Sequence, residues 1–277
     1  MPELPEVELI SRSLNTLLRG RQIVSAKLLR QRLAPHTAPP VFARRLRDRQ
    51  VNVVTRRGKH ILFDLNGGLT LIVHLRMSGR FSILPDEREN PKFTHAVFNL
   101  ADGGRLVFDD QRHFGFMRLV DTQALAETNE LKKLAPEPFS DEFSIDHFRT
   151  VLRGSGRRIK EVLLDQTKVT GVGNIYASEA LYVAAVYPGI RANKLTGPKA
   201  ARLHESIRVV LREAIDFGAK LPVDPENLEG NYFSSGAEPT WTVYDRENQP
   251  CRACATPIAR LKQAGRSTYY CRKCQRR

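Results

Sequence analysis

The four cysteines of the chain lie near its end and are paired, as Cys251-x2-Cys254 and Cys271-x2-Cys274. Two such pairs supply four thiolates, which is the ligand set of a closed, tetrahedral zinc site. The first residues do not resemble a secretory signal, so we expect a reducing compartment in which disulfides are disfavoured. A ribbon this short cannot bury a sufficient core, and a metal would supply the missing stability. The spacing therefore predicts one structural Zn²⁺ ion in a C-terminal zinc ribbon.

The charge of the chain constrains its partner. Lys and Arg number 44 against 30 Asp and Glu, which gives a net charge of +14 and a pI near 10.0. Such an excess repels itself unless an anion offsets it, so nucleic acid or an anionic membrane surface is the expected partner. Apolar residues make up 41% of the chain, as in globular proteins. The longest apolar stretch, Leu69–Leu75, is short and contains His74, which argues against a transmembrane span.

The hydrophobic pattern divides the chain into a strand-rich part and a helix-rich part. A leading helix is predicted over 5–18, where apolar residues follow the helical period. Repeated β-rich runs joined by glycine-rich turns favour an antiparallel sandwich before a linker at 135–138. The predicted strands are 51–55, 60–65, 69–75, 96–100 and 105–109, and the later helices are 145–152, 159–164, 175–185 and 199–217. A loop is predicted over 220–236, before the ribbon.

The N-terminus carries the group with the most distinctive chemistry. If Met1 is removed, Pro2 presents a secondary amine, and α-amino groups have pKa values of about 8, so part of it is unprotonated near neutral pH. Such an amine can attack an electrophilic carbon to form an iminium, and Glu3 and Glu6 are close enough in sequence to act as acid and base. The alternative is structural, because Pro and Glu are also favoured in the first turn of a helix.

Other candidate residues have structural explanations of equal or greater weight. The glycine-rich stretch before Asn174 fits an anion site at a helix start, and it also fits a simple capping turn. Lys59 follows a basic stretch and fits a solvated edge strand. Met77, Arg112 and Phe114 lie on predicted loops or strand ends. An apolar side chain beside an arginine can wedge into a base step, but Met and Phe also pack in cores.

Taken in order along the chain, these features resemble the formamidopyrimidine-DNA glycosylase family. The resemblance rests on Met1–Glu8 (MPELPEVE), His74–Gly79 (HLRMSG), Gly171–Ala177 (GVGNIYA) and the terminal four-cysteine ribbon. It covers essentially the whole chain. The partner that it implies is double-stranded DNA with oxidised bases or abasic sites. We further expect a cytoplasmic, bacterial-type monomer that does not bind a membrane.

The same resemblance implies an α+β multidomain fold. An N-terminal catalytic β-sandwich domain with a leading helix is expected over 1–134. A helical, helix-two-turn-helix DNA-binding domain with a lesion-capping loop is expected over 135–236. A zinc finger is expected over 237–277, with the DNA bound between the two lobes.

The resemblance also assigns roles to residues of this chain. Pro2 resembles the nucleophile that attacks C1′ of a damaged nucleotide, Glu3 the acid that assists sugar opening or base departure, and Glu6 a supporting carboxylate. Lys59 matches a lysine of proton transfer and phosphate contact in β-elimination, and Arg266 an arginine of phosphate binding and δ-elimination. The residues with implied DNA contacts are His74, Met77, His95, Arg112, Phe114, Lys160 and Asn174. Met77, Arg112 and Phe114 match the trio that fills the gap left by the flipped nucleotide.

The chain departs from the family pattern at positions that bear on the damaged base. His113 stands where an arginine is usual, Gln111 where proline is usual, and Arg76 where glycine is usual. Phe93 lies near a position where a DNA-contacting histidine is common. The segment Gly218–Val223 (GAKLPV) lacks the glycine-, serine- and threonine-rich run of the loop that covers a flipped oxidised purine. The incision residues are therefore expected to be intact, whereas the damaged-base preference is left open.

Three functions fit the sequence. The first is a base-excision repair glycosylase that removes oxidised purines through a Pro2 Schiff base and cleaves the abasic strand by β,δ-elimination. The second keeps the scaffold and prefers oxidised pyrimidines, as the endonuclease VIII branch does. Leu4 argues against it, because that branch typically has glycine there, and the altered loop argues for it. The third is a zinc-ribbon DNA-binding protein without catalysis, which would need neither the Pro2-Glu3 start nor Lys59.

Overall fold

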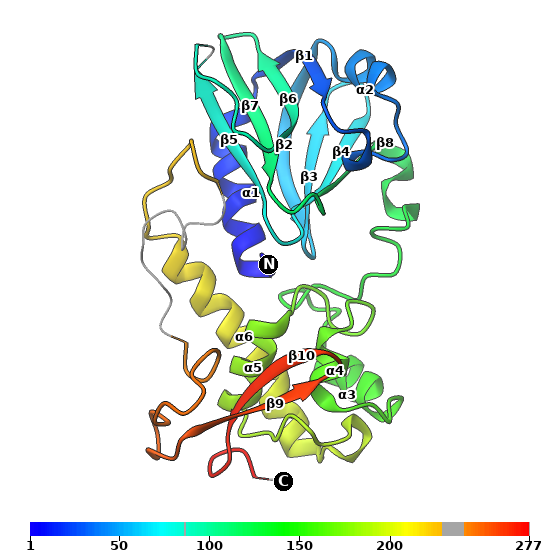
Figure 1. Cartoon of the computed structure of the whole chain (residues 1–277). Coiled ribbons are helices and arrows are strands. Elements are labelled where there is room, and N and C mark those ends of the chain that lie inside the picture. The colour runs from blue at the N-terminus through cyan, green and yellow to red at the C-terminus, as the bar shows by residue number, and fades with distance from the viewer. Residues whose placement is uncertain (86, 229–240, 277) are drawn as a thin grey trace. The chain divides into compact units, whose positions relative to one another are not determined.

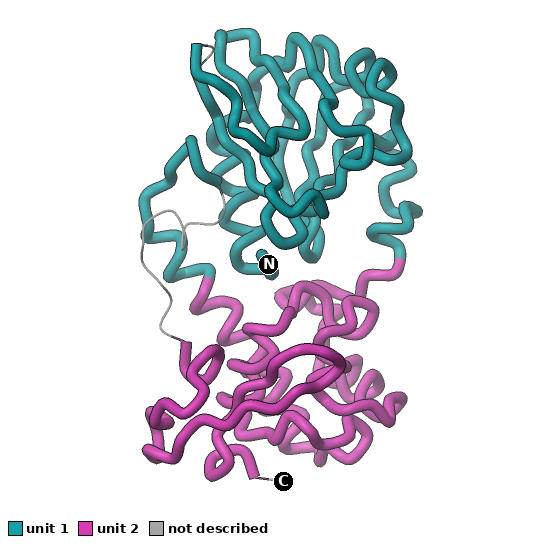
Figure 2. The backbone as a smooth tube through the Cα atoms, viewed as in Figure 1, with its two compact units in different colours: residues 1–132, 215–238 teal, residues 133–214, 239–277 magenta. Residues whose placement is uncertain are grey.

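The structure is a computed structural model that describes residues 1–85, 87–228 and 241–276. The chain divides into two compact units (Figure 2). Unit 1 comprises Met1–Lys132 and Ile215–Glu238, and unit 2 comprises Lys133–Ala214 and Pro239–Arg277. The expected domain boundary at 134/135 falls close to the first crossing between the units, whereas the one at 236/237 lies outside the described residues. The helical residues between 145 and 214 belong to the same unit as the zinc ribbon.

Helix α1 (Leu4–Leu18) opens unit 1 and begins one residue before the predicted start. Val7, Ile10 and Leu14 recur at helical spacing and are almost fully buried, so one face of α1 packs on the sheet. Asn15 accepts a hydrogen bond of 2.9 Å from a backbone N–H of the sheet, which fixes the helix along it. The residues before α1 are therefore held close to the sheet.

Eight antiparallel strands form the sheet of unit 1, in the spatial order β5-β7-β6-β1-β2-β3-β4-β8 (Figure 1). The ladder between β1 and β2 is only two residue pairs long and separates two four-stranded halves. Phe63 of β3 and Phe81 of β5 meet edge-to-face with 5.5 Å between ring centroids, so the halves pack against each other as a sandwich. The strands are β1 (Gln22–Leu28), β2 (Arg49–Arg57), β3 (His60–Leu65), β4 (Leu69–His74), β5 (Gly79–Pro85), β6 (Thr94–Leu100), β7 (Gly104–Asp110) and β8 (Phe116–Asp121).

Several elements of unit 1 were not predicted from the hydrophobic pattern. These are β1, β5, β8 and helix α2 (Pro39–Leu46), which packs on β1 and brings Phe42 to 6.0 Å from the ring of Phe98. Helix α2 begins with two prolines, which resemble a loop in sequence but are compatible with a first helical turn. Strand β5 ends in Pro85, which is tolerated because β5 lies at the edge of the sheet. Two short 3-10 turns, η1 (Gln31–Leu33) and η2 (Thr122–Glu127), complete unit 1.

Unit 2 combines four helices with a two-stranded hairpin, as the sequence predicts. The helices are α3 (Ile145–Arg153), α4 (Ile159–Leu164), α5 (Asn174–Val183) and α6 (Gly197–Gly218), joined in part by the 3-10 turn η3 (Ala192–Lys194). The hairpin strands are β9 (Ile258–Gln263) and β10 (Arg266–Cys271). Helix α6 is long and mostly polar, and it passes from unit 2 into unit 1 between residues 214 and 215. Within the parts of the chain that are described, no helix has the length and apolar character needed to cross a membrane.

The residues that follow α6 extend the sheet of unit 1. Ile83 of β5 donates its N–H to the carbonyl of Pro225 at 2.8 Å, and Leu228 donates its N–H to the carbonyl of Phe81 at 2.8 Å. Leu228 is 3% exposed and belongs to the core of the sandwich. As far as residue 228, the predicted loop over 220–236 therefore continues the sheet beyond β5. Residues 229–236 of that loop lie outside the described residues.

Candidate active site and metal centre

The start of α1 places Glu3 and Glu6 in a reciprocal capping box. The Glu3 side chain accepts a hydrogen bond from the backbone N–H of Glu6, and the Glu6 carboxylate accepts one from the backbone N–H of Glu3 at 2.8 Å. Both residues are buried, with exposures of 2% and 3%. Pro2, directly before them, is half-buried. The structural explanation for these glutamates therefore holds, and the same bonds fix both carboxylates next to the N-terminus.

A cavity of about 430 Å³ opens beside the N-terminus. Met1 and Pro2 form part of its wall, together with Met77, Ser78 and Gln111 from two distant segments of the chain. Its volume is in the range of pockets that hold small ligands. The structure thus brings the predicted nucleophile and one predicted wedge residue to the same cavity.

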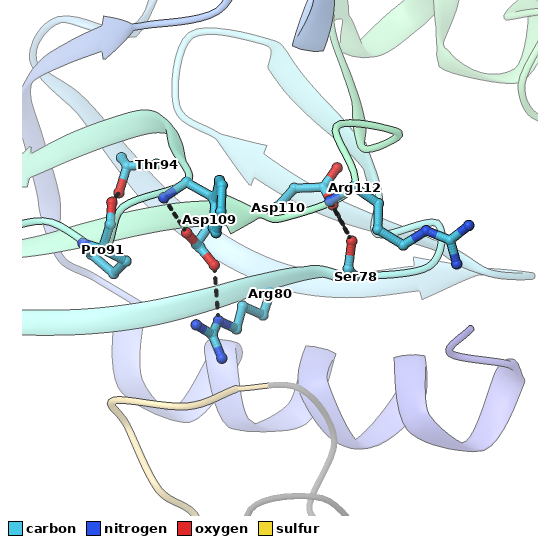
Figure 3. Close-up of polar contacts among 8 residues, drawn as sticks. Ser78, Arg80, Pro91, Thr94, Asp109, Asp110 and Arg112 are labelled. Atoms are coloured by element: carbon cyan, nitrogen blue, oxygen red, sulfur yellow. Dashed lines mark hydrogen bonds and ion pairs between the residues drawn. The ribbon is translucent and has the colours of Figure 1, made fainter.

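Asp110, the last residue of β7, joins the two turns that carry the predicted wedge (Figure 3). Its carboxylate accepts hydrogen bonds from Ser78 Oγ at 2.5 Å, from the Arg112 N–H at 3.2 Å and from the Gly115 N–H at 2.6 Å. The Arg112 N–H also donates to Ser78 Oγ at 3.0 Å. Asp110 is completely buried, and a buried carboxylate with several N–H and O–H donors is a strong fixed point. The turn at 75–79 and the turn at 111–115 therefore form one platform.

The platform presents two large apolar side chains to solvent. Met77 is 46% exposed and Phe114 is 47% exposed, and the Arg112 guanidinium lies 5.4 Å from the centre of the Phe114 ring. A Cβ atom at Gly79 or Gly115 would lie 2.8 Å from the Phe108 ring, so both turns need glycine to approach the core this closely. The geometry that holds the trio Met77, Arg112 and Phe114 is thus specified by the sandwich beneath it.

The neighbouring Asp109 organises the cavity wall (Figure 3). It is 3% exposed and accepts hydrogen bonds of 3.1 Å from Arg80 Nε and from the Phe93 N–H. Arg80 and Phe93 both line the cavity. Asp109 and Asp110 were not predicted as site residues, because two acids at the end of a strand resemble an ordinary turn signal. Successive strand residues point to opposite faces, so adjacent acids at a strand end place one carboxylate on each face. Their position directly before the segment of Arg112 was the one sequence signal that could have identified Asp109 and Asp110.

His95 supports the wedge turn from inside the sandwich. It is 3% exposed, its Nε2 lies 2.9 Å from His113 Nδ1, and the two rings stack with 5.0 Å between centroids. Burial lowers the pKa of His95 below its ordinary value, which favours the neutral ring at pH 7. His113 itself adopts a left-handed backbone with φ of 60° beside Arg112. His95, for which a DNA contact was expected, therefore lies buried behind the turn that carries Arg112.

Lys59 lies in the turn between β2 and β3, beside two buried histidines. It is 6% exposed, and the His60 and His74 rings meet edge-to-face with 4.7 Å between centroids. Burial lowers the pKa of His60 to about 4. Burial also lowers the pKa of His74 well below its ordinary value, and the charges of His60, Arg76 and Lys59 lower it further. Both imidazoles are therefore neutral at pH 7, and the charges that act on them come from Arg57, Arg76 and Lys59, opposed at His60 by Glu130.

In unit 2, Asn174 is the first residue of α5 and is half-buried. Its Oδ1 is a buried atom without a hydrogen-bond partner among the residues that the structure describes. Gln166 braces the preceding glycine-rich stretch, since its side chain accepts from the Gly171 N–H at 2.9 Å and donates to the Val172 carbonyl at 2.9 Å. The helix start is thus fixed in place, as both the anion-site and the capping-turn interpretations require.

The cysteine residues form a compact cluster whose Sγ atoms all lie within 4.8 Å of one another. The Sγ–Sγ distances are 3.5 Å for Cys254–Cys271, 3.5 Å for Cys254–Cys274 and 3.9 Å for Cys251–Cys274. Tetrahedral zinc with Zn–S bonds of about 2.3 Å requires about 3.8 Å between sulfurs. The four cysteines therefore fit one structural zinc ion without an open coordination position, and Tyr182 Oη lies 3.3 Å from Cys251 Sγ.

Arg266 is exposed at the tip of the hairpin, where β10 begins. Behind the tip, Lys160 of α4 is 1% exposed, and its Nζ donates to the Ser267 carbonyl at 3.0 Å and to Thr268 Oγ1 at 2.9 Å. The amine that was expected to contact phosphate is thus engaged inside unit 2. This placement favours a role for Lys160 in positioning the strand of Arg266.

Glu179 of α5 makes a second attachment between the helices and the zinc ribbon. It is 6% exposed and accepts backbone N–H bonds from Thr242, Val243 and Tyr244 at 2.8, 2.9 and 2.9 Å. Gln275 Nε2 adds a 2.9 Å bond to a backbone carbonyl beyond α5. Glu179 was not predicted, because a single glutamate in a helix carries no sequence signal of the amides that it binds.

Three family models match the chain and together span most of its length. The formamidopyrimidine-DNA glycosylase N-terminal domain matches residues 1–117, the H2TH domain of the same enzymes matches 134–222, and the zinc finger found in FPG and IleRS matches 248–277. The formamidopyrimidine-DNA glycosylase of Herpetosiphon aurantiacus is 40% identical over 277 residues, which cover 99% of this chain and 100% of that protein. The one of Heliobacterium modesticaldum is 41% identical over 282 residues, which cover all of both chains.

Solved structures of the Lactococcus lactis enzyme have the same fold. Its complex with DNA containing an oxidized pyrimidine superimposes with a TM-score of 0.90 at 32% identity and covers 100% of both chains. Its non-covalent complex with DNA containing an AP site gives a TM-score of 0.88 at 32% identity and covers 99% of this chain and 100% of that one.

Proposed function

Because the chain belongs to the formamidopyrimidine-DNA glycosylase family, we propose that Pro2 is the nucleophile of a combined DNA glycosylase and abasic-site lyase. The family acts on damaged DNA in base-excision repair. The proposed base substrates are oxidised purines, namely formamidopyrimidines and 8-oxoguanine. The observation that carries the proposal is the cavity that Pro2 shares with Met77, with the Glu3 carboxylate fixed next to it.

The chemistry begins with the nitrogen of Pro2 after Met1 has been removed. Its lone pair forms a bond to C1′ while the bond from C1′ to the base breaks, and the departing base takes up a proton. Opening of the sugar ring with protonation of O4′ leaves a cationic iminium, and we assign that proton to Glu3, which directly follows Pro2. The iminium acidifies the 2′ hydrogen, so its loss expels the 3′ phosphate, and loss of the 4′ hydrogen then expels the 5′ phosphate.

A base inside a duplex hides C1′, so the damaged nucleotide has to leave the stack before this attack. Unstacking costs a few kcal/mol, which side chains that fill the vacated space offset. Met77 and Phe114 are the exposed apolar side chains of the two turns that Asp110 joins, and Arg112 accompanies Phe114. Because Asp110 fixes both turns, the wedge is pre-organised before DNA binds.

Phosphate contacts are proposed for cationic and amide groups of both units. In unit 1, Lys59 lies beside His60 and His74, whose lowered pKa values keep both rings neutral at pH 7. Neither histidine therefore offers a cation to a phosphate there. In unit 2, the exposed Arg266 and the helix start at Asn174 offer one guanidinium and one amide. The net charge of +14 supports the same assignment, because phosphate neutralisation dominates affinity for DNA.

A preference for oxidised pyrimidines stays the second candidate. The segment Gly218–Val223 departs from the purine-capping pattern, and a Lactococcus lactis relative has been solved with DNA containing an oxidized pyrimidine. Abasic-site cleavage needs the amine and the kinked backbone, whereas base excision also needs the base pocket. We therefore expect robust abasic-site cleavage and good excision of formamidopyrimidines, with 8-oxoguanine removed more slowly.

The test of the nucleophile is borohydride trapping on abasic-site DNA. Protein with a verified Pro2 start is expected to form a covalent adduct, and an otherwise identical protein with an N-terminal extension is expected to form none while still binding DNA. Mass spectrometry of the wild-type adduct should place the link on Pro2. Full trapping and base excision by the extended protein would contradict the assignment of Pro2 as the nucleophile.

The test of the lesion class is single-turnover excision on matched duplexes. These carry an abasic site, a formamidopyrimidine, 8-oxoguanine opposite cytosine, or an oxidised pyrimidine. If 8-oxoguanine is removed as fast as the abasic site is cut, the altered loop is irrelevant. If the oxidised pyrimidine is by far the best base substrate, the second candidate replaces the first.

A further inference from the structure

Arg76 occupies a strained backbone position beside the wedge. It lies in the turn between β4 and β5, directly before Met77, and has a φ of 56°. This left-handed region suits glycine, and a side chain with a Cβ atom adopts it at a cost. The Arg76 N–H donates to His74 Nδ1 at 3.0 Å, so the turn keeps this conformation although the residue is not glycine. Strain of this kind persists where the surroundings enforce it and tends to mark functional sites.

Among the described residues, the guanidinium of Arg76 has no counter-ion. The side chain is exposed, and among the described residues it makes no hydrogen bond or ion pair. Other arginines of unit 1 do have carboxylate partners, such as Arg80 with Asp109 at 3.1 Å and Arg118 with Glu130 at 2.9 Å. The strained backbone at Arg76 therefore costs stability, and no contact of the side chain with the described residues offsets that cost.

The charge of Arg76 adds to a cationic cluster. It contributes to the lowered pKa values of His60 and His74, and Lys59 contributes to that of His74 as well. The carboxylate that opposes this effect at His60 is Glu130, which is already paired with Arg118. Positive charge gathered in this way next to the exposed Met77 favours an anion at the surface.

We propose that Arg76 is an additional phosphate-binding residue, which contacts the DNA backbone beside the step that Met77 enters. The inference rests on the proposed function, because it needs the wedge to be inserted into DNA. It accounts for the strained backbone, the exposed guanidinium and the missing counter-ion together. A backbone phosphate supplies the counter-ion only in the complex, so the residue is destabilising in the protein alone and stabilising when DNA is bound.

The experiment compares Arg76→Gly with wild type in two measurements. Glycine relieves the left-handed strain, so the Tm of the protein alone should rise by roughly 1–3 °C. Affinity for a duplex with a tetrahydrofuran abasic analogue should fall roughly tenfold at low salt, since a charge-assisted phosphate contact is lost. If wild type neutralises four to six phosphates, its log–log salt slope should be about −4 to −5, and the variant's slope should be shallower by about 0.9.

Two further variants separate charge from strain. Arg76→Lys keeps a cation and should recover part of the affinity and the full salt slope. Asp48→Gly relieves the strain of a non-glycine residue with a φ of 58° at another exposed position, and it should raise the Tm without weakening DNA binding. Unchanged affinity and salt slope in Arg76→Gly would overturn the inference, and so would a weaker affinity with an unchanged slope. Failure of wild-type protein to be trapped by borohydride on abasic DNA would instead overturn the proposed function.

Discussion

The wedge turns of unit 1 rest on a large apolar core, whereas the zinc hairpin of unit 2 rests on a small apolar cluster and a set of buried polar bonds. The turns of Arg76 and His113 carry left-handed backbones and are joined by Asp110 above the rings of Phe81 and Phe108. The apolar cluster of the hairpin consists of only Val243, Cys251, Ile258, Tyr269 and Cys271 among the described buried residues. A large core can therefore hold strained functional turns, while a small one depends on tethers and on a metal.

The comparison predicts that metal loss damages one unit only, and this is the largest expected effect. Cys271→Ser removes a ligand from a site type whose zinc affinity contributes roughly 10–16 kcal/mol to folding, so the hairpin should lose its order and DNA affinity should fall through misplacement of Arg266. The single tryptophan, Trp241, contacts Tyr176 of α5 and reports on unit 2. Its fluorescence should change, while the sheet signal in circular dichroism is retained.

Chelation of the wild-type protein provides the matched control. It should reproduce the fluorescence change of Cys271→Ser, and readdition of zinc should reverse it only in the wild type. Elemental analysis that finds no zinc in protein purified without chelators would contradict the assignment.

The opposite experiment removes the tether of unit 1. Asp110→Asn keeps the shape of the side chain but replaces one carboxylate oxygen with an NH2 group. That group is a donor, and it would face buried N–H or O–H donors that need an acceptor. We expect the sheet transition in urea to lose about 2–4 kcal/mol, with little change in zinc retention. Asp146→Asn, on the exposed start of α3, is the control and should change stability by less than about 0.5 kcal/mol. Equal effects of the two variants would show that Asp110 does not hold the platform.

The two units should also differ in their response to mild acid, through His60. The unfolded chain binds a proton at a pKa of about 6.5, whereas folded His60 stays neutral down to about 4. The stabilisation is therefore present above pH 6.5 and is lost as the pH falls toward 4, and between pH 7 and 5 it amounts to about 2 kcal/mol. His74 acts in the same direction.

The measurement is the change in sheet stability between pH 7 and 5 for wild type and His60→Phe. The variant keeps a ring against His74 and should lose much of the difference. His36→Phe, at an exposed position, should retain it. A pH dependence that is the same in all three proteins would remove His60 from the explanation.

The smallest expected effect comes from a tether of unit 2. Lys160→Met removes two hydrogen bonds to β10, and we expect a loss of about 1–2 kcal/mol in hairpin stability with faster zinc release to a chelator. Lys168→Met removes the same charge from an exposed position and should leave zinc release unchanged. If Lys160 contacts a phosphate directly, Lys160→Met would instead lower the salt slope of DNA binding without altering zinc release, and that result would support the DNA contact expected from the sequence.

The sequence was most informative where local pattern decides structure. The predicted helices and strands all lie within two residues of their observed bounds, because hydrophobic period and turn residues act over short distances. They are the helices α1, α3, α4, α5 and α6 and the strands β2, β3, β4, β6 and β7. The zinc ligands were predicted for the same reason, since their spacing is a local property. The roles of Pro2, Glu3 and Lys59 came from resemblance, and they stay predictions until they are tested.

The residues that were missed act through contacts distant in sequence. Asp110 accepts a hydrogen bond from Ser78, and Glu179 accepts hydrogen bonds from backbone N–H groups more than 60 residues away in the sequence. A carboxylate in a strand end or a helix has the same local sequence whether it binds buried amides or faces water. Only the register of β5 against β7, and the packing of α5 on the ribbon, decide between these states.

The pairing of Pro225 and Leu228 with β5 has a consequence for biosynthesis. An open sheet edge is a template for association with other chains, and β5 is the terminal strand of its sheet. The segment that covers this edge is translated 140 residues after Pro85, which corresponds to roughly 7–28 s at about 5–20 residues per second. Nascent chains that stall before Pro225 therefore expose the edge of β5 and lack Leu228 of the sandwich core, and we expect them to be prone to aggregation.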